Sequence, residues 1–138
     1  MRITYMEIKM KKIIKIILVI AIVISTVFVM RRYGWKLTGF KLCQNSMIYD
    51  VQVDENRATI KGRDANFIPR GFVGYYYEIE DNCLYIGFRF SSIFGFFEKS
   101  EYQIEINSDE KINKIIMKSA ESETVIYDIL EKQQSLSQ

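Results

Sequence analysis

The longest uncharged stretch in this chain covers residues 16–30 and reads IILVIAIVISTVFVM. Together with the three residues before it, it makes a helix of about eighteen residues, or about 27 Å at roughly 1.5 Å per residue. That length is close to the hydrocarbon core of a bilayer, which is about 30 Å thick. A buried helix of a globular domain would carry polar residues along one face, and this stretch offers only Ser25 and Thr26. We therefore predict a transmembrane helix over residues 13–30, with the lipid bilayer as its partner.

Both ends of this segment carry side chains suited to the membrane interface. Long basic side chains lie along apolar surface while their charges reach the headgroups, and amphipathic aromatic rings prefer the same depth. The candidate interface residues are Lys12, Lys15, Arg31, Arg32, Tyr33 and Trp35. Five basic residues precede the apolar stretch and four follow it closely, so the positive-inside count barely decides the orientation. A short basic head followed by an apolar stretch resembles an export signal, and we expect the carboxyl-terminal domain outside the cytoplasm.

The segment resembles a signal-anchor more than a cleaved signal peptide. A cleaved signal has a shorter apolar stretch that ends at small residues. Residues 23–25, Val-Ile-Ser, loosely match such a site, but the apolar stretch continues to Met30. We expect the segment to be kept, with cleavage and release as the alternative. Met10 is a second candidate start, which would make residues 1–9 an upstream extension.

After this helix the apolar residues alternate with a period of two instead of 3.6. Across residues 84–90, Leu, Ile, Phe and Phe alternate with Tyr, Gly and Arg, so one face of a strand is apolar. Asp81-Asn82 is a two-residue connection of types that tolerate positive φ. Residues 72–80 and 83–91 are therefore predicted to form a β-hairpin.

Similar alternation and short polar turns recur along the rest of the domain. We predict about seven strands, which indicates an all-β fold, either a small antiparallel β-sandwich or a barrel, preceded by one amino-terminal transmembrane helix. The expected organisation is a basic amino-terminal segment (1–12), a signal-anchor helix (13–30), a connector (31–45), a β-domain (46–128) and a polar tail (129–138).

The near-neutral charge of the chain hides two regions of opposite sign. The totals are 19 basic and 17 acidic residues, a net charge of +2. Nine basic residues and one acid lie before residue 42, whereas ten basic residues and sixteen acids follow. A basic anchor thus precedes an acidic domain. Because the aromatic residues of that domain are interleaved with acids, we expect no nucleic-acid partner.

The residues give no pattern for catalysis or for a cofactor. The chain has no histidine and no C-x-x-C pair, so a zinc or copper site would need an unusual ligand set. The acids near Asp50 and Asp54 do not fit the D-x-D-x-D-G calcium loop. No phosphate-binding loop or nucleophile elbow stands in the chain. We expect no catalytic residues, no metal, no cofactor and no enzymatic activity.

Two cysteines lie forty positions apart in the sequence. Outside the cytoplasm, Cys43 and Cys83 are a candidate disulfide between the connector and the start of a strand. The alternative is a buried thiol on a strand and an unrelated thiol in the connector.

The feature of the β-domain that most suggests an interaction surface is its local density of aromatic residues. Tyr76 and Tyr85 are expected on the outward face of adjacent strands, and an apolar cluster follows in the loop after the hairpin. The candidate interaction surface consists of Tyr76, Tyr85, Ile93, Phe94, Phe96 and Phe97. A surface of this kind suits a protein partner or the bilayer. The alternative is structural, with loop rings covering the open end of a small core and cross-strand ring packing that stiffens the hairpin.

The segments GYYYEIEDNCLYIGFRF and EYQIEINSDEKINKIIMK resemble a known group of proteins in the order and spacing of their residue types. An aromatic hairpin followed by strands rich in isoleucine and lysine resembles uncharacterised small membrane-anchored or secreted β-domain proteins of low-GC Gram-positive bacteria. The resemblance covers roughly residues 71–127 and implies no catalytic residues.

These features favour a single-pass membrane protein that displays a small non-catalytic β-domain for interaction with a protein or an envelope component. Two alternatives remain open. One is a secreted β-domain released by signal cleavage, and the other is a membrane-anchored immunity or exclusion protein.

Overall fold

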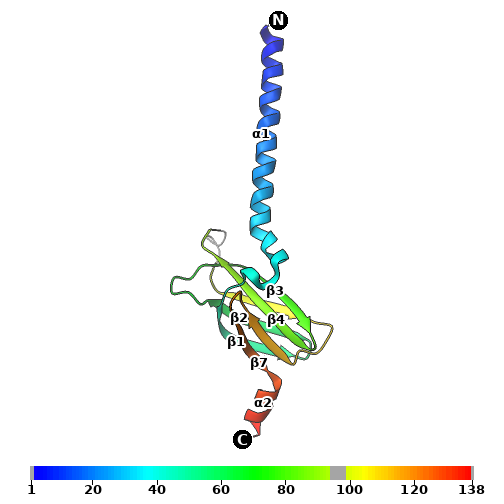
Figure 1. Cartoon of the computed structure of the whole chain (residues 1–138), viewed down its shortest axis with the longest axis vertical. Helices are drawn as coiled ribbons and strands as arrows, with labels where there is room; N and C mark the ends of the chain where they lie inside the picture. The colour runs from blue at the N-terminus through cyan, green and yellow to red at the C-terminus, as the bar shows by residue number, and fades with distance from the viewer. Residues whose placement is uncertain (1, 94–98, 138) are drawn as a thin grey trace. The chain divides into compact units, whose positions relative to one another are not determined.

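The computed structural model describes residues 2–93 and 99–137 of the chain (Figure 1). It divides into two compact units, the first ending at Trp35 and the second beginning at Lys36. The first unit holds helix α1, and the second is the β-domain.

Helix α1 (Arg2–Tyr33) is longer than the helix predicted over residues 13–30. It continues because no glycine or proline interrupts residues 2–33, and it stops where Gly34 begins. Among the described residues, α1 is the helix long and apolar enough to cross a membrane, and none of its apolar window is buried in the structure. A signal sequence has the same length and composition, so the finding fits an anchor or a signal.

The predicted connector folds into turns of 3-10 helix, η1 (Gly34–Leu42). The turns are broken at Gly39, whose φ of 63° and ψ of −130° suit glycine and few other residues. A side chain at this position would also contact the ring of Tyr76 at 3.7 Å. The polar tail is helical as well, and forms α2 (Ile129–Leu136). Its N-cap is Asp128, whose carboxylate accepts a hydrogen bond from the backbone of Leu130 at 2.9 Å. The prediction of an all-β fold is therefore only partly confirmed, because it left out the helical turns of the connector and helix α2.

The described part of the β-domain has the seven strands that were predicted, and they form two sheets. The first sheet has the order β1-β2-β5, with β1 (Ser46–Asp54), β2 (Arg57–Asp64) and β5 (Tyr102–Asn107). The second has the order β3-β4-β6-β7, with β3 (Gly71–Glu80), β4 (Cys83–Ser91), β6 (Lys114–Lys118) and β7 (Glu123–Asp128).

The predicted hairpin is confirmed by β3 and β4, which are joined at Asp81 and Asn82 with φ of 50° and 62°. The expectation of a purely antiparallel domain is wrong at one place, because β4 and β6 pair in parallel. After β4 the chain crosses to the other sheet as β5 and returns near the start of β4, where the backbone of Asn113 donates to Asn82 at 2.9 Å. Strand β6 therefore runs in the direction of β4.

One hydrophobic core receives side chains from both sheets. The first sheet contributes residues such as Ile60 and Ile106, and the second contributes residues such as Ile86 and Phe88. Tyr102 lies between them, with its ring stacked 4.7 Å from that of Phe88. The hydroxyl of Tyr102 is hydrogen-bonded to that of Ser46 at 2.5 Å, which satisfies the polar end of a buried ring.

Candidate functional site

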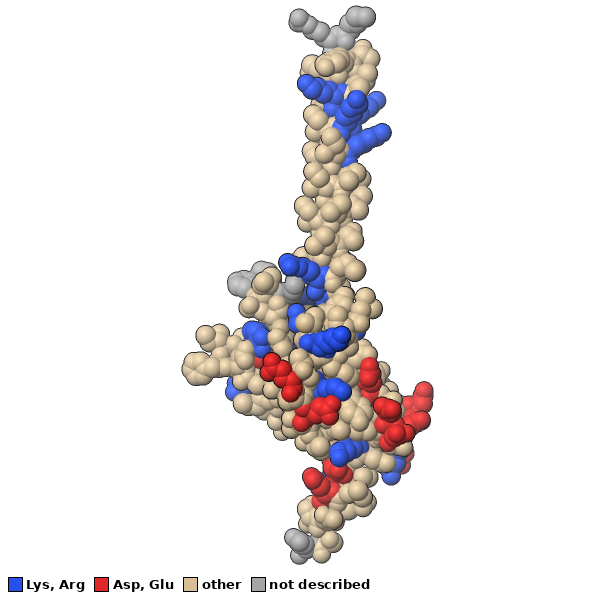
Figure 2. Space-filling view, viewed as in Figure 1, with Lys and Arg blue, Asp and Glu red and all other residues tan. Residues whose placement is uncertain are grey.

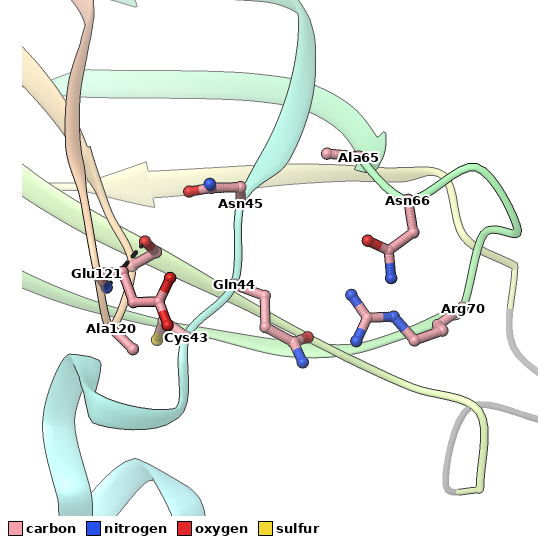
Figure 3. A pocket seen from close by; sticks show the side chains of 9 residues that line it. Cys43, Gln44, Asn45, Ala65, Asn66, Arg70, Ala120 and Glu121 are labelled. Atoms are coloured by element: carbon pink, nitrogen blue, oxygen red, sulfur yellow. Dashed lines mark hydrogen bonds between the residues drawn. The ribbon is translucent and has the colours of Figure 1, made fainter.

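A polar cleft of about 320 Å³ opens on the β-domain (Figure 3). Three segments far apart in the sequence form it: the end of the connector, the loop between β2 and β3, and the turn between β6 and β7. The lining residues are Cys43, Gln44, Asn45, Ala65, Asn66, Arg70, Ser119, Ala120 and Glu121.

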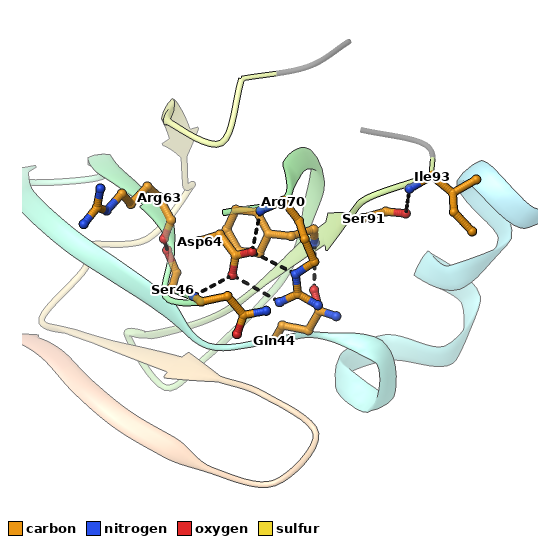
Figure 4. Close-up of polar contacts among 9 residues, drawn as sticks. Gln44, Ser46, Arg63, Asp64, Arg70, Ser91 and Ile93 are labelled. Carbon is orange, nitrogen blue, oxygen red and sulfur yellow. Dashed lines mark hydrogen bonds and ion pairs between the residues drawn. The ribbon is translucent and has the colours of Figure 1, made fainter. Parts of the chain in front are cut away.

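An ion pair between Asp64 and Arg70 holds the loop that forms one wall (Figure 4). The guanidinium donates from Nε to Oδ2 at 2.8 Å and from Nη2 to Oδ1 at 3.1 Å. The same carboxylate accepts from the backbone amides of Arg70 and Asn66 at 2.8 and 3.2 Å. The side chain of Asp64 is fully buried, and the side chain of Arg70 is 26% exposed. The carboxylate thus organises its own loop.

These contacts decide the charge state of the pair. Burial of Asp64 acts to raise its pKa, but the hydrogen bonds and charge of Arg70 outweigh burial and hold the pKa below its ordinary value. Arg70 has a raised pKa, chiefly because it donates to Asp64. Both groups stay charged at neutral pH. With its amide oxygen turned toward the guanidinium, Asn66 accepts from Nη2 at 2.9 Å, and Figure 3 shows the two side chains facing each other.

Amide side chains line the opposite wall. The side-chain oxygen of Gln44 accepts from the backbone of Phe90 at 2.9 Å, and that of Asn45 accepts from the hydroxyl of Ser122 at 3.0 Å. These bonds fix the two amides, whose NH₂ groups are hydrogen-bond donors. The wall therefore suits a polar ligand that carries acceptors.

Cys43 is one of the residues that line the cleft, and it is almost fully buried. Burial raises its pKa to about 11, and the nearby charge of Arg89 offsets this only partly. A neutral thiol is a poor nucleophile at physiological pH. Among the described residues, Glu121 is the one carboxylate that lines the cleft. This set of groups suits binding better than acid-base or nucleophilic chemistry.

Metal binding has no support in the part of the chain that the structure describes. Within it, no three cysteine, aspartate or glutamate side chains come together as a candidate metal site.

Tyr76 and Tyr85 lie on the outward face of the second sheet, as expected from the alternation. Both rings have neighbours there. Phe40 of the connector contacts Tyr76 edge-on at 5.0 Å, and the ammonium of Lys118 lies 5.7 Å from the ring of Tyr85. The hydroxyl of Tyr76 also donates to the carboxylate of Glu78 at 2.5 Å. These contacts favour the structural interpretation for Tyr76.

Ile93 of the predicted interaction surface is 79% exposed. The predicted residues Phe94, Phe96 and Phe97 lie outside the described residues. The structure does not bring Ile93 together with the two tyrosines, since it follows the far end of β4.

The candidate membrane-interface residues occupy the length of α1 and its end. Lys12, Lys15 and Arg31 are exposed, and the guanidinium of Arg32 lies 5.8 Å from the ring of Tyr33. Trp35 differs from the others, because only 4% of its surface is exposed.

The two cysteines are free thiols, and the candidate disulfide is not formed. Cys43 lies beside Gly87, which is four residues beyond Cys83 on β4. At about 3.3 Å per residue, four residues correspond to about 13 Å, whereas bridged cysteines have Cα atoms within about 7 Å.

The sequence does not single out Asp64 and Arg70 as site residues, because residues 62–71, with glycine at both ends and the proline at 69, have the composition of a loop. A signal was present in the alternation of Ala58, Ile60 and Gly62, which continues inward to Asp64. An acid on the inner face of a strand needs a partner, since burial of an unpaired charge is costly. Sequence alone does not say that Arg70 is that partner.

Comparison with known proteins finds no match to a family model, to a curated protein or to a solved structure. The resemblance to small β-domain proteins of Gram-positive bacteria stays a prediction. The function proposed below therefore comes from the residues and geometry of this chain.

Proposed function

We propose that this chain is a single-pass membrane protein that displays a non-catalytic binding domain. The observation that carries the proposal is the pairing of an unburied apolar helix with a separate, well-packed β-domain. An unburied apolar helix of this length is costly in water and stable in a bilayer. In this proposal α1 is the anchor, and the β-domain is the working part.

The two sheets of the β-domain form a small sandwich in this proposal. Support comes from the single core that receives side chains from both sheets. The domain faces the outside of the cytoplasm, because a short basic head followed by an apolar stretch resembles an export signal.

The partner is a protein or an envelope component that binds at the polar cleft. The cleft offers fixed amide groups from Gln44, Asn45 and Asn66 beside a guanidinium. Amides both donate and accept hydrogen bonds, and so match peptide groups or sugar hydroxyls. The buried neutral thiol of Cys43 supports binding without catalysis.

Photo-crosslinking from the cleft in living cells tests this function. A photoreactive amino acid replaces Asn66 on the exposed rim, and a matched control variant carries it at Gln52, an exposed position on β1. We expect an adduct of discrete mass from position 66 and none from position 52. Adducts of equal yield at both positions, or at neither, would contradict binding at the cleft.

Release after signal cleavage is the second candidate, since a signal sequence has the same features as α1. The mass of the mature chain separates the two. An anchored protein retains residues 13–30, whereas a secreted one lacks them and is found in the medium.

A further inference from the structure

The β-domain has two ends with different surfaces. The loop end comprises the connector, the β2–β3 loop, the β6–β7 turn and the described residues 91–93 and 99–101. Its parts lie together: Gly71 pairs with Ser91, and the backbone of Phe72 donates to Lys99 at 3.0 Å. The turn end comprises the β1–β2 turn, the β3–β4 turn and the segment after β5, which are joined by the hydrogen bonds from Ser108 to Asn56 and from Asn113 to Asn82.

Large apolar side chains are exposed at the loop end. Phe67 and Ile68 at the tip of the β2–β3 loop are 101% and 79% exposed, Ile93 is 79% exposed, and Leu37 of the connector is 84% exposed. The loop holding the first two is fixed at its base by Asp64, which accepts from both Asn66 and Arg70. A loop that is fixed at its base and presents apolar residues to solvent indicates an interaction surface.

Charge also differs between the two ends. Among the described residues, the loop end carries the basic residues Lys36, Lys41, Arg63, Arg70, Arg89, Lys99 and Lys118, and its exposed acids are Glu101, Glu121 and Glu123. The turn end is acidic on balance, because its exposed bases Arg57 and Lys111 are outnumbered by the acids Asp54, Glu55, Glu80, Asp81, Asp109 and Glu110. Figure 2 shows acidic side chains gathered at the right edge of the β-domain, near the β3–β4 turn. Basic and apolar groups together suit an anionic lipid surface, and the acids at the other end do not.

Chain connectivity restricts what the loop end can reach. The apolar stretch of α1 ends at Met30, and the β-domain begins at Lys36. Six residues span at most about 21 Å even when fully extended. Once α1 is in a bilayer, the first residues of the loop end are held close to that bilayer. The turn end lies about 30 Å from the loop end, because the nine residues of β4 separate the two ends of the domain.

We infer that the loop end is a membrane-docking surface, on which Phe67, Ile68 and Ile93 enter the interface of an anionic bilayer. The lysines and arginines around them contact the headgroups. The inference rests on the proposed function, because α1 supplies the anchor. It adds that the β-domain lies against the membrane instead of being held away from it.

Depth-dependent quenching in vesicles tests this surface. Both variants of the full chain carry Cys83→Ser, which removes a partly exposed thiol that would also be labelled. One variant carries an environment-sensitive fluorophore at Ile68→Cys. The matched control carries the same fluorophore at Glu55→Cys on the turn end. Buried Cys43 is retained in both variants. Each is reconstituted into vesicles of phosphatidylcholine and phosphatidylglycerol that contain lipids spin-labelled near the interface. Because interfacial side chains reach only about 5–10 Å into the bilayer, we expect quenching at least about twofold stronger at position 68 than at position 55. Vesicles of phosphatidylcholine alone should reduce the quenching at position 68.

Alkaline extraction of the same vesicles separates failure of the two ideas. A chain that resists extraction but shows equal quenching at both positions would overturn the docking surface and leave the anchor intact. A chain that is extracted would overturn the anchor, and the docking surface with it.

Discussion

At the scale of single residues, the ion pair of Asp64 and Arg70 is the feature that most defines this domain. The carboxylate is fully buried, and two backbone amides donate to it besides the guanidinium. It fixes a six-residue loop that forms one wall of the polar cleft and presents Phe67 and Ile68. Asp64, which lies in a stretch with the composition of a loop, therefore positions both candidate surfaces.

The change Asp64→Asn should strongly destabilise the domain. It leaves the guanidinium without its buried partner, and loss of one member of a buried pair costs about 3 kcal/mol or more. The matched control is Asp50→Asn, whose ion pair with Lys61 is 3.8 Å long and exposed on both sides. The control should cost less than about 1 kcal/mol. Urea unfolding of the full chain in mild detergent, followed by near-ultraviolet circular dichroism, measures both. Equal costs would contradict this role of Asp64.

The same carboxylate predicts how stability depends on pH. The pKa of Asp64 is lower in the folded state than its ordinary value of about 4. Its contribution is therefore fully present above pH 4 and is lost as the pH falls below that value. The free energy of unfolding should fall less between pH 5 and pH 3 in Asp64→Asn than in the wild type. An identical fall in both chains would contradict the lowered pKa.

At the scale of elements, strand β4 and the connector depend on each other through Gly87. A Cβ at this position would lie 2.7 Å from the Cβ of Cys43 and 2.8 Å from the carbonyl oxygen of Lys118. The connector is also joined to β4 by hydrogen bonds, from the backbone of Gln44 to Phe88 at 2.7 Å and from Arg89 to Leu42 at 2.9 Å. The absence of a side chain at Gly87 is what allows the connector to cover the sheet.

The change Gly87→Ala should separate the connector from β4. We expect a loss of about 1–3 kcal/mol in the free energy of unfolding, as is typical when a methyl group is forced into a packed site. Maleimide labelling of Cys43 should also become faster, because the added methyl group pushes Cys43 away from β4 and exposes its thiol. The control is Gly34→Ala, where a Cβ would meet nothing within 4 Å. Unchanged stability and labelling in Gly87→Ala would contradict this packing.

The elements also show what sequence can and cannot predict here. Alternation in residues 84–90 and the turn at Asp81-Asn82 predicted the β3–β4 hairpin correctly, because both signals are local. The parallel pairing of β4 with β6 is not local, since it depends on where the chain returns after β5. The tail was predicted to be polar with at most one helical turn, whereas the N-cap at Asp128 begins the eight-residue helix α2.

The candidate site was harder to predict than the strands. Tyr76 and Tyr85 were placed correctly on the outward face. The contact of Phe40 with the ring of Tyr76 was not predicted, because the connector shows no regular spacing of apolar residues. The cleft joins three segments that are far apart along the chain. Such a meeting depends on tertiary packing, which a single sequence does not reveal.

At the scale of the whole molecule, the chain joins an apolar helix to a β-domain of opposite net charge. The basic residues near the helix suit headgroups, and the acids of the domain keep most of its surface soluble. The near-neutral net charge of the whole chain thus describes neither the basic helix region nor the acidic β-domain. In the function proposed for this chain, α1 stays in the membrane and displays the β-domain outside the cytoplasm.

Protease accessibility in intact protoplasts tests that claim most directly. A specific protease site and an epitope tag follow residue 138 of the full chain, and the protease is added from outside. We predict that the membrane-bound chain, still carrying residues 13–30, loses its tag while a tagged cytoplasmic protein keeps its own. A tag that is removed only after lysis, or a chain found outside the membrane fraction, would contradict the account.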